Sequence, residues 1–324
     1  MGGAARSVKR GARMVATAGS PDYAHGEAMR FGSLLSSFIF PSALAVLAGC
    51  TTSVSSPGEP PADAEVSTNA TAIVVVEGSS TNEGVRTEAV ARFVRARSGV
   101  VDADALRMVG AAVDFPVAGS CASLGSRAPA ARAVSLLDVG GVTLFAGESV
   151  AALQPRQLPD VADLVSGVVY SFGGSAAGAA RGPALLPAKS AYLLRVDGAP
   201  ESDVAPFAVS AKSPGEPADV RFGGDDGRGG AVSIAAGRAT ELTWEAGSGE
   251  DAIYVDLAGT SSAPTMRCLF VDSGHAQLGA AAFGALDDGT ITVHRLHRET
   301  FHAHGVDPGE VRFDFARVVA FVRR

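Results

Sequence analysis

The sequence predicts an all-β fold, built as two antiparallel β-sandwich-like domains over residues 70–212 and 213–324. After residue 70, short β-branched and aromatic runs alternate with polar residues through most of the chain. Glycine accounts for 39 of the 324 residues, and many glycines lie between these runs, where tight turns require them. Only residues 102–112 combine helical apolar spacing with an N-cap candidate, Asp102. This pattern is typical of sandwiches and barrels.

Residues 1–69 precede the predicted strands and differ from them in composition. The apolar run Phe31–Val46 follows Arg30 and is followed by small residues and a cysteine. This run is too short for a membrane-spanning helix, which needs about 20 apolar residues. A basic residue, an apolar core and small residues at a cleavage site are the parts of a signal peptide. We therefore expect residues 29–49 to be a signal peptide.

The end of this arrangement, Leu47-Ala48-Gly49-Cys50, resembles the lipobox of bacterial lipoproteins. The resemblance implies that Cys50 is lipidated and that the lipid holds the mature chain in the bacterial cell envelope. By the sorting rule known for such proteins, Thr51 in place of aspartate implies the outer membrane.

The segments on either side of the signal peptide are expected to lie outside the fold. Residues 1–28 carry four basic residues and no apolar periodicity, which indicates either an overlong basic region or a misassigned start codon. Residues 50–69 are rich in Ser, Thr, Pro and acid. A segment of this kind buries too little apolar surface to become ordered, so we expect a disordered tether behind the lipid.

The charge of the mature chain limits its partners. Removing residues 1–49 takes away five basic and two acidic residues, which changes the net charge from −7 to −10. An acidic chain without a basic cluster is unsuited to nucleic acid. Membrane contact is expected only through the lipid anchor. The remaining partner classes are an unidentified envelope protein or a glycan.

The first predicted domain contains seven candidate strands and few helical segments. The strands are Ile73–Val76, Ala89–Arg97, Val134–Leu136, Val142–Phe145, Val168–Phe172, Ala191–Val196 and Phe207–Val209. Single helical turns are expected at Val150–Leu153 and Pro159–Val165.

The second domain is expected to follow a linker, Ser213–Pro217, in which two prolines and a glycine interrupt strand structure. Apolar residues then alternate with polar ones in several runs, and Asp287–Gly289 favours a hairpin turn. An inward-facing Trp244 two strands before an inward-facing Cys268 is similar to an immunoglobulin-like β-sandwich. The resemblance covers Pro217–Arg324 and lacks the antibody-type cysteine pair. The two halves together resemble uncharacterised all-β lipoproteins, which implies no particular activity.

With Cys50 assigned to lipid, Cys121 and Cys268 remain. An exported protein permits a disulfide between them, which would join the two predicted domains. The alternative is that both thiols are free and buried as small apolar side chains.

The C-terminal histidines give the clearest candidate for a metal site. His294, His302 and His304 are metal-binding residue types and suggest, as an alternative function, a metal-dependent hydrolase. However, Arg295 and Arg298 would repel a cation, and no familiar ligand spacing accompanies the histidines. We therefore expect no metal and no other cofactor.

Catalytic motifs are missing from the sequence. It contains no G-x-S-x-G, and no strand–loop–helix context for a phosphate or dinucleotide loop. Tyr254 is the best candidate for an exposed aromatic of a glycan-binding or adhesive surface, the second alternative. The sequence thus favours a cell-envelope lipoprotein with a non-catalytic binding or structural role.

Overall fold

The computed structural model describes residues 69–125, 128–173, 186–260 and 262–324, all within one compact unit. Strands make up 56% of the described residues and helices 5%, which confirms the predicted all-β class. Cys50, the predicted signal peptide and the predicted tether up to residue 68 lie outside the described residues. In the described ranges, no helix is long and apolar enough to cross a membrane.

Seventeen strands and three short helices make up the described part. The strands are β1 (Ala70–Thr81), β2 (Gly84–Ala96), β3 (Ser120–Ser123), β4 (Val134–Leu136), β5 (Val142–Ala146), β6 (Ser149–Val161), β7 (Val165–Phe172), β8 (Ala191–Val196), β9 (Phe207–Lys212), β10 (Arg221–Phe222), β11 (Val232–Ile234), β12 (Thr240–Thr243), β13 (Ala252–Gly259), β14 (Met266–Val271), β15 (His275–Leu278), β16 (Asp288–Ala303) and β17 (Val306–Arg323). The helices are α1 (Ala103–Met108) and the 3₁₀ turns η1 (Pro200–Ser202) and η2 (Ala280–Phe283).

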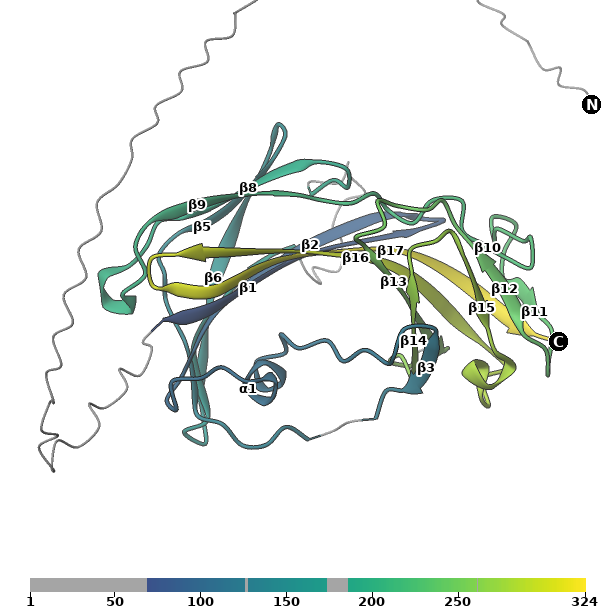
Figure 1. Cartoon of the computed structure of the whole chain (residues 1–324), viewed down its shortest axis with the longest axis horizontal. Helices are drawn as coiled ribbons and strands as arrows, with labels where there is room; N and C mark the ends of the chain where they lie inside the picture. Colours follow the sequence, from purple (N-terminus) through teal and green to yellow (C-terminus); the bar gives the residue numbers. More distant parts are fainter. Residues whose placement is uncertain (1–68, 126–127, 174–185, 261) are drawn as a thin grey trace, which may run out of the picture. The chain divides into compact units, whose positions relative to one another are not determined.

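One large sheet dominates the fold (Figure 1). It has 14 strands in the order β3-β14-β13-β16-β17-β1-β2-β4-β7-β6-β5-β8-β9, with β11 beside β17. A second sheet has three strands in the order β10-β12-β15. Most pairs are antiparallel, as expected, but β1 and β17 are parallel, so the first and last described strands meet in the middle of the sheet.

We expected residues 70–212 and 213–324 to fold as separate domains, and the structure differs in how the two parts meet. One core lies entirely within residues 220–321, but the largest core combines residues of the first part with Phe301, Phe313 and Phe315. The reason is the length of β16 and β17, which have 16 and 18 residues. At about 3.3 Å per residue, such strands are long enough to serve both cores.

Several local predictions can be compared with the structure. Asp102 caps α1 by accepting a hydrogen bond from the Ala105 amide at 2.8 Å, as the sequence predicted. Val150–Leu153 is part of strand β6 and not a helical turn. The expected hairpin turn at Asp287–Gly289 is also wrong, because η2 leads into β16 and the strand already begins at Asp288.

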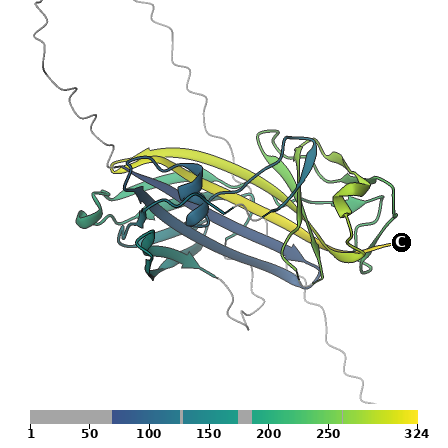
Figure 2. The same cartoon turned by 90° about the horizontal axis from the view of Figure 1, so that it is seen from below.

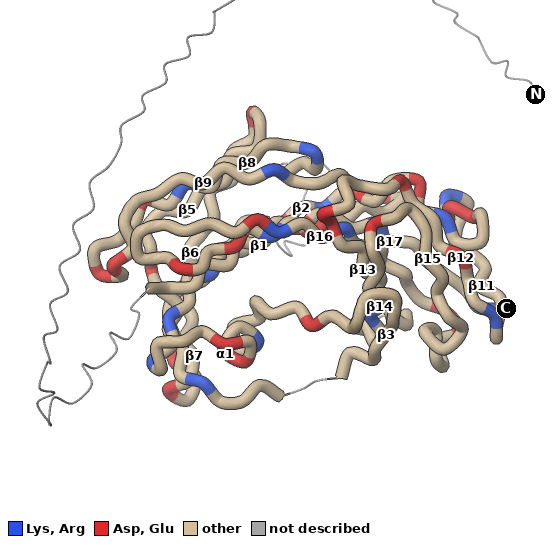
Figure 3. The backbone as a smooth tube through the Cα atoms, in the orientation of Figure 1, with Lys and Arg blue, Asp and Glu red and all other residues tan. Residues whose placement is uncertain are grey.

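A polar surface lies on one side of the central strands. Along β17, Val311, Phe313 and Phe315 face the largest core, while Glu310, Arg312 and Asp314 alternate with them and face the other way. We call this second side of β13, β16, β17, β1 and β2 the inner face. By this alternation it carries the acidic Glu310 and Asp314 and the basic Arg312. Figure 3 marks where acidic and basic residues occur along the backbone of these strands.

Two elements cover the inner face, and both views show them on the same side of the sheet (Figures 1 and 2). Helix α1 packs against Ile73 and Val75 through Ala105 and Val109, in a small third core. The chain then crosses the sheet as an irregular segment, residues 109–123, which we call the strap, and ends in β3. In this way α1 covers one end of the inner face and the strap crosses the remainder.

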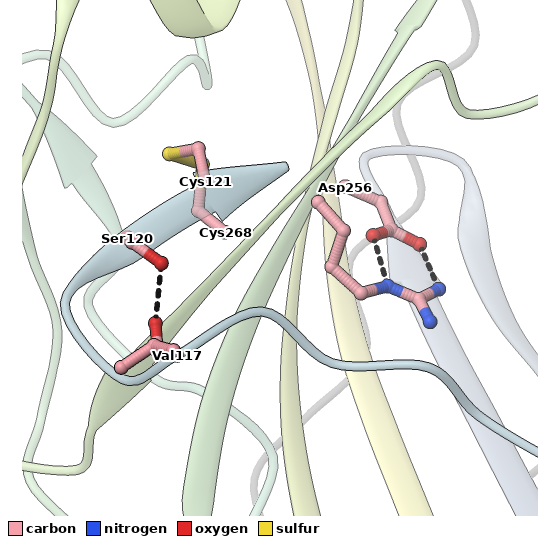
Figure 4. Close-up of a disulfide and its surroundings, with 6 residues drawn as sticks. Val117, Ser120, Cys121, Asp256 and Cys268 are labelled. Atoms are coloured by element: carbon pink, nitrogen blue, oxygen red, sulfur yellow. Dashed lines mark hydrogen bonds and ion pairs between the residues drawn. A yellow bond between two sulfur atoms is a disulfide. The ribbon is translucent and has the colours of Figure 1, made fainter. Parts of the chain in front are cut away.

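A disulfide fixes the end of the strap. Cys121 on β3 and Cys268 on β14 are register partners, and their sulfur atoms are bonded (Figure 4). Of the two alternatives that the sequence allows, a disulfide or two free thiols, the structure has the disulfide. Ser120 supports the turn before it by donating a hydrogen bond to the Val117 carbonyl at 2.6 Å.

Candidate functional site

Three carboxylates lie side by side on the inner face. Glu77 on β1 is the register partner of Asp314 on β17 and also of Glu88 on β2. Register partners project their side chains from the same face of a sheet, and like charges in such positions destabilise it. We call Glu88, Glu77 and Asp314 the acid row.

Asp314, at one end of the acid row, is held by two aromatic side chains. Tyr254 donates its hydroxyl to Asp314 Oδ2, and His294 Nδ1 lies 2.9 Å from Oδ1. The Tyr254 and His294 rings are stacked, with centroids 4.1 Å apart. Tyr254 is buried, and burial together with the Asp314 charge raises the pKa of its hydroxyl well above the ordinary value. Asp314 is therefore rigidly placed.

Arg267 forms a second fixed pair beside Tyr254. Its Nε and Nη2 donate to the two oxygens of Asp256, both at 2.7 Å, from neighbouring positions on β14 and β13 (Figure 4). The guanidinium also lies over the Tyr254 ring, 4.7 Å from its centroid. Arg267 and Asp256 compensate each other's charge. This pair therefore offers no uncompensated charge to a ligand.

The other end of the acid row is exposed. Glu88 pairs with Arg86 at 3.1 Å, and the two side chains are 33% and 54% exposed. An exposed pair of this kind contributes little stability and is readily exchanged for another partner.

Glu77, the middle residue of the acid row, is the unusual one. It has no hydrogen bond or ion pair within 4 Å to any described residue. Partial burial raises the pKa of Glu77, and the neighbouring charges of Asp314 and Glu88 raise it further. The side chain is nevertheless solvent-accessible. Glu77 is thus a carboxylate without a partner, in a position that favours a positive ligand group.

A cavity of about 240 Å³ opens onto these groups. Most of its lining residues are polar or charged, and they include the acid row, the Tyr254 and His294 rings, and the Asp256–Arg267 pair. The lining residues are Glu77, Gly78, Ser79, Arg86, Glu88, Tyr254, Asp256, Arg267, Thr292, His294, Asp314 and Ala316. We call it the Glu77 pocket.

A larger pocket of about 790 Å³ lies around Arg295, His297 and Glu299, on the other side of β16. Buried Arg295 donates to both oxygens of Asp272, at 2.7 and 3.2 Å, and to three main-chain carbonyls of residues 215, 216 and 245. Asp272 also accepts from Trp244 Nε1 at 2.6 Å. These buried, satisfied bonds hold the predicted linker Ser213–Pro217 against the sheet, which is a structural role.

The structure does not bring the three histidines of the metal hypothesis together. His294 lies in the Glu77 pocket, whereas His302 pairs with Asp307 at 2.9 Å at the exposed end of the β16–β17 hairpin, with His304 beside it. Among the residues that the structure describes, no group of three or more His, Cys, Asp or Glu side chains is arranged to hold a metal ion. Tyr254 is 3% exposed and so offers no stacking platform for a sugar.

The acid row could not be predicted from the sequence, because its three members lie on three different strands. Alternation does predict that Glu77 faces away from Val74 and Val76, since both valines are fully buried. That Asp314 lies beside Glu77 depends on the parallel β1–β17 pair, for which no local pattern gives a signal.

The chain matches no protein-family model, and no curated protein shows significant sequence similarity to it.

Proposed function

We propose that the protein is a lipid-anchored component of the bacterial cell envelope, and that its β unit binds a ligand without transforming it. The arrangement of basic residue, apolar core, small residues and Cys50 supports the anchor. A disulfide between Cys121 and Cys268 is compatible with an oxidising compartment outside the cytoplasm. The outer membrane is the proposed location, from Thr51 after the cysteine.

The observation that carries the binding role is the unpaired carboxylate of Glu77 in its pocket. Two further carboxylates flank it, so a ligand group that fits must be cationic. The cavity of about 240 Å³ is large enough for a single ammonium or guanidinium group on an alkyl chain. We therefore propose that the Glu77 pocket receives a basic side chain or amine of an envelope protein or glycan.

A non-catalytic role agrees with the surroundings of His294. Asp314 orients its ring as a carboxylate orients a general base. Such a base needs a nucleophile within hydrogen-bond reach, and no described hydroxyl or thiol is hydrogen-bonded to His294. Ala316 lies between His294 and the nearest serine in the row, Ser79. The histidine therefore holds Asp314 in place.

Isothermal titration of the detergent-solubilised full chain with a tri-lysine peptide tests this proposal. We expect binding to the wild type and about tenfold weaker binding to Glu77→Gln, because a charge-assisted contact contributes about 1.5–3 kcal/mol. Glu201→Gln is the matched control, since Glu201 is an exposed carboxylate on η1. Equal affinity of the wild type and Glu77→Gln, or no binding to either, would reject the role of the pocket.

A further inference from the structure

Three arginines gather on the inner face next to the acid row. Arg298 on β16 and Arg312 on β17 are register partners, one step along β17 from Asp314 on the same face. Arg92 on β2 lies across from Ile73, which in turn pairs with Glu310 of β17. Like charges in directly opposed positions destabilise a sheet, so the opposed Arg298 and Arg312 require a shared counter-charge.

Only one carboxylate contacts this group among the residues that the structure describes. Glu310 Oε1 lies 2.8 Å from Arg312 Nε and 3.7 Å from Arg298 Nε. The same oxygen therefore serves two guanidinium groups. Arg312 also donates to the Ala111 carbonyl at 2.9 Å and is buried. The cluster holds more positive than negative charge.

Arg92 has no partner in the described structure. Its Nε is buried without a hydrogen-bond acceptor, and no ion pair reaches its guanidinium. Burial lowers the pKa of Arg92, and the positive charge of Arg312 lowers it further, whereas Glu77 acts in the opposite direction from beyond ion-pair distance. A desolvated guanidinium with an unsatisfied donor is costly unless an anion completes it.

The strap limits access to this cluster. A side chain on Gly110 would come within 3.8 Å of Arg92 Nη2, so this guanidinium lies beneath the strap. Phe115 of the strap lies against Arg298, with the guanidinium 5.5 Å from the ring centroid. Because apolar surface excludes water, an anion bound here would interact more strongly than one at an open surface.

We propose that Arg92, Arg298 and Arg312 form an oxyanion subsite next to the Glu77 pocket, so that the ligand carries a negative group as well as a positive one. This inference rests on the proposed function for its cationic half. Neighbouring residues on one face of a strand are about 7 Å apart, which sets the separation of the two ligand charges. The planar guanidinium fork binds two oxygens of a carboxylate or a phosphate at once, so the negative group is one of these two.

The experiment uses the full chain and three probes at constant ionic strength: inorganic phosphate, acetate and 6-aminohexanoate. Isothermal titration is performed on the wild type, Arg92→Gln, Glu77→Gln and a control, Arg195→Gln, whose side chain is 64% exposed on β8. We expect at least one of the two simple anions to bind the wild type and to bind Arg92→Gln about tenfold more weakly. Glu77→Gln and Arg195→Gln should retain anion binding, while 6-aminohexanoate should be weakened in both Arg92→Gln and Glu77→Gln.

The simple anions separate this inference from the proposed function. If neither anion binds the wild type, or if anion binding is unchanged in Arg92→Gln, the subsite does not exist, whatever the tri-lysine result. If anions bind through Arg92 but Glu77→Gln leaves both tri-lysine and 6-aminohexanoate binding intact, the oxyanion subsite stands and the cationic pocket is wrong. Arg298→Gln, with a side chain 42% exposed, gives a second test in case Arg92→Gln fails to fold. It should weaken anion binding, and an unchanged affinity would count against the subsite.

Discussion

Glu77 of β1 and Asp314 of β17 are directly opposite each other in a parallel strand pair. Asp314 is held in place by its contacts with Tyr254 and His294, whereas Glu77 has no such partner within the described residues. The two carboxylates therefore differ in role. Asp314 is part of the wall of the pocket, and Glu77 is the group available to a ligand.

Replacing Glu77 with glutamine should stabilise the free protein near neutral pH. The pKa of Glu77 is raised in the folded state, so the fold binds this proton more tightly than the unfolded chain does. The resulting stability is present at acidic pH and is lost as the pH rises through the raised pKa. We expect the free energy of unfolding of Glu77→Gln to exceed that of the wild type by about 0.2–1 kcal/mol at pH 7. Near pH 3 the two free energies of unfolding should be equal.

Urea unfolding across this pH range checks the prediction, with Glu201→Gln as the control for the loss of an exposed carboxylate. A Glu77→Gln variant that is less stable than the wild type at pH 7 would mean that Glu77 is already paired.

The hydrogen bond from Tyr254 to Asp314 should contribute to stability through a coupled network. Tyr254→Phe removes a buried hydroxyl and leaves Asp314 with one partner fewer, so we expect a loss of about 1–3 kcal/mol. Asp314→Asn should cost a similar amount, and the double variant should cost less than the sum of the two. Urea unfolding of the four proteins gives the coupling free energy, and strict additivity would argue against a direct bond.

The disulfide should hold the strap more than it holds the sheet. The double variant Cys121→Ser, Cys268→Ser should lose about 2–5 kcal/mol, because a cross-link between distant residues restricts the unfolded chain. The amides next to the disulfide are hydrogen-bonded, Gly119 to the Leu269 carbonyl at 2.7 Å and Leu124 to the Thr265 carbonyl at 2.9 Å, so their exchange and that of β3 should accelerate most. Hydrogen exchange measured by mass spectrometry checks this, with β1 as the internal reference. Equal acceleration in the strap and in β1 would contradict a local role.

Lipidation at Cys50 has a direct biochemical test. Cys50→Ala should release the protein from the membrane fraction and remove the lipid mass from its N-terminal peptide, because no other group is expected to anchor the chain. Cys121→Ser should leave both properties unchanged and serves as the control for losing a cysteine. Wild-type protein with an unmodified Cys50 would remove the basis for the proposed location.

Most of the correct predictions rest on the alternation of apolar and polar residues along strands and on the helix N-cap. The register of buried Val311, Phe313 and Phe315 and the cap at Asp102 follow from neighbours in the sequence. The linker-like composition of Ser213–Pro217 predicts a domain boundary between residues 212 and 213. Its carbonyls are instead bound by Arg295, a contact across 80 residues that local composition does not reveal.

The candidate site was less predictable for the same reason. In the sequence, His294 belongs only to an alternative metal hypothesis, together with His302 and His304. In the structure, its ring contacts Asp314 and Tyr254 on the two strands beside it. Strand order decides such contacts, and a single sequence does not specify strand order. The sequence shows Glu77 only as a single acidic residue after the apolar run Ile73–Val76, without its neighbours in the sheet.

The most direct test of the central claim is an amide chemical-shift titration of the ¹⁵N-labelled full chain with the tri-lysine peptide. If the Glu77 pocket binds a cationic group, the largest shifts should fall on the three strands of the acid row, at Glu77, Glu88 and Asp314, and should disappear in Glu77→Gln. Shifts centred on the pocket around Arg295, or shifts that persist unchanged in Glu77→Gln, would contradict the account.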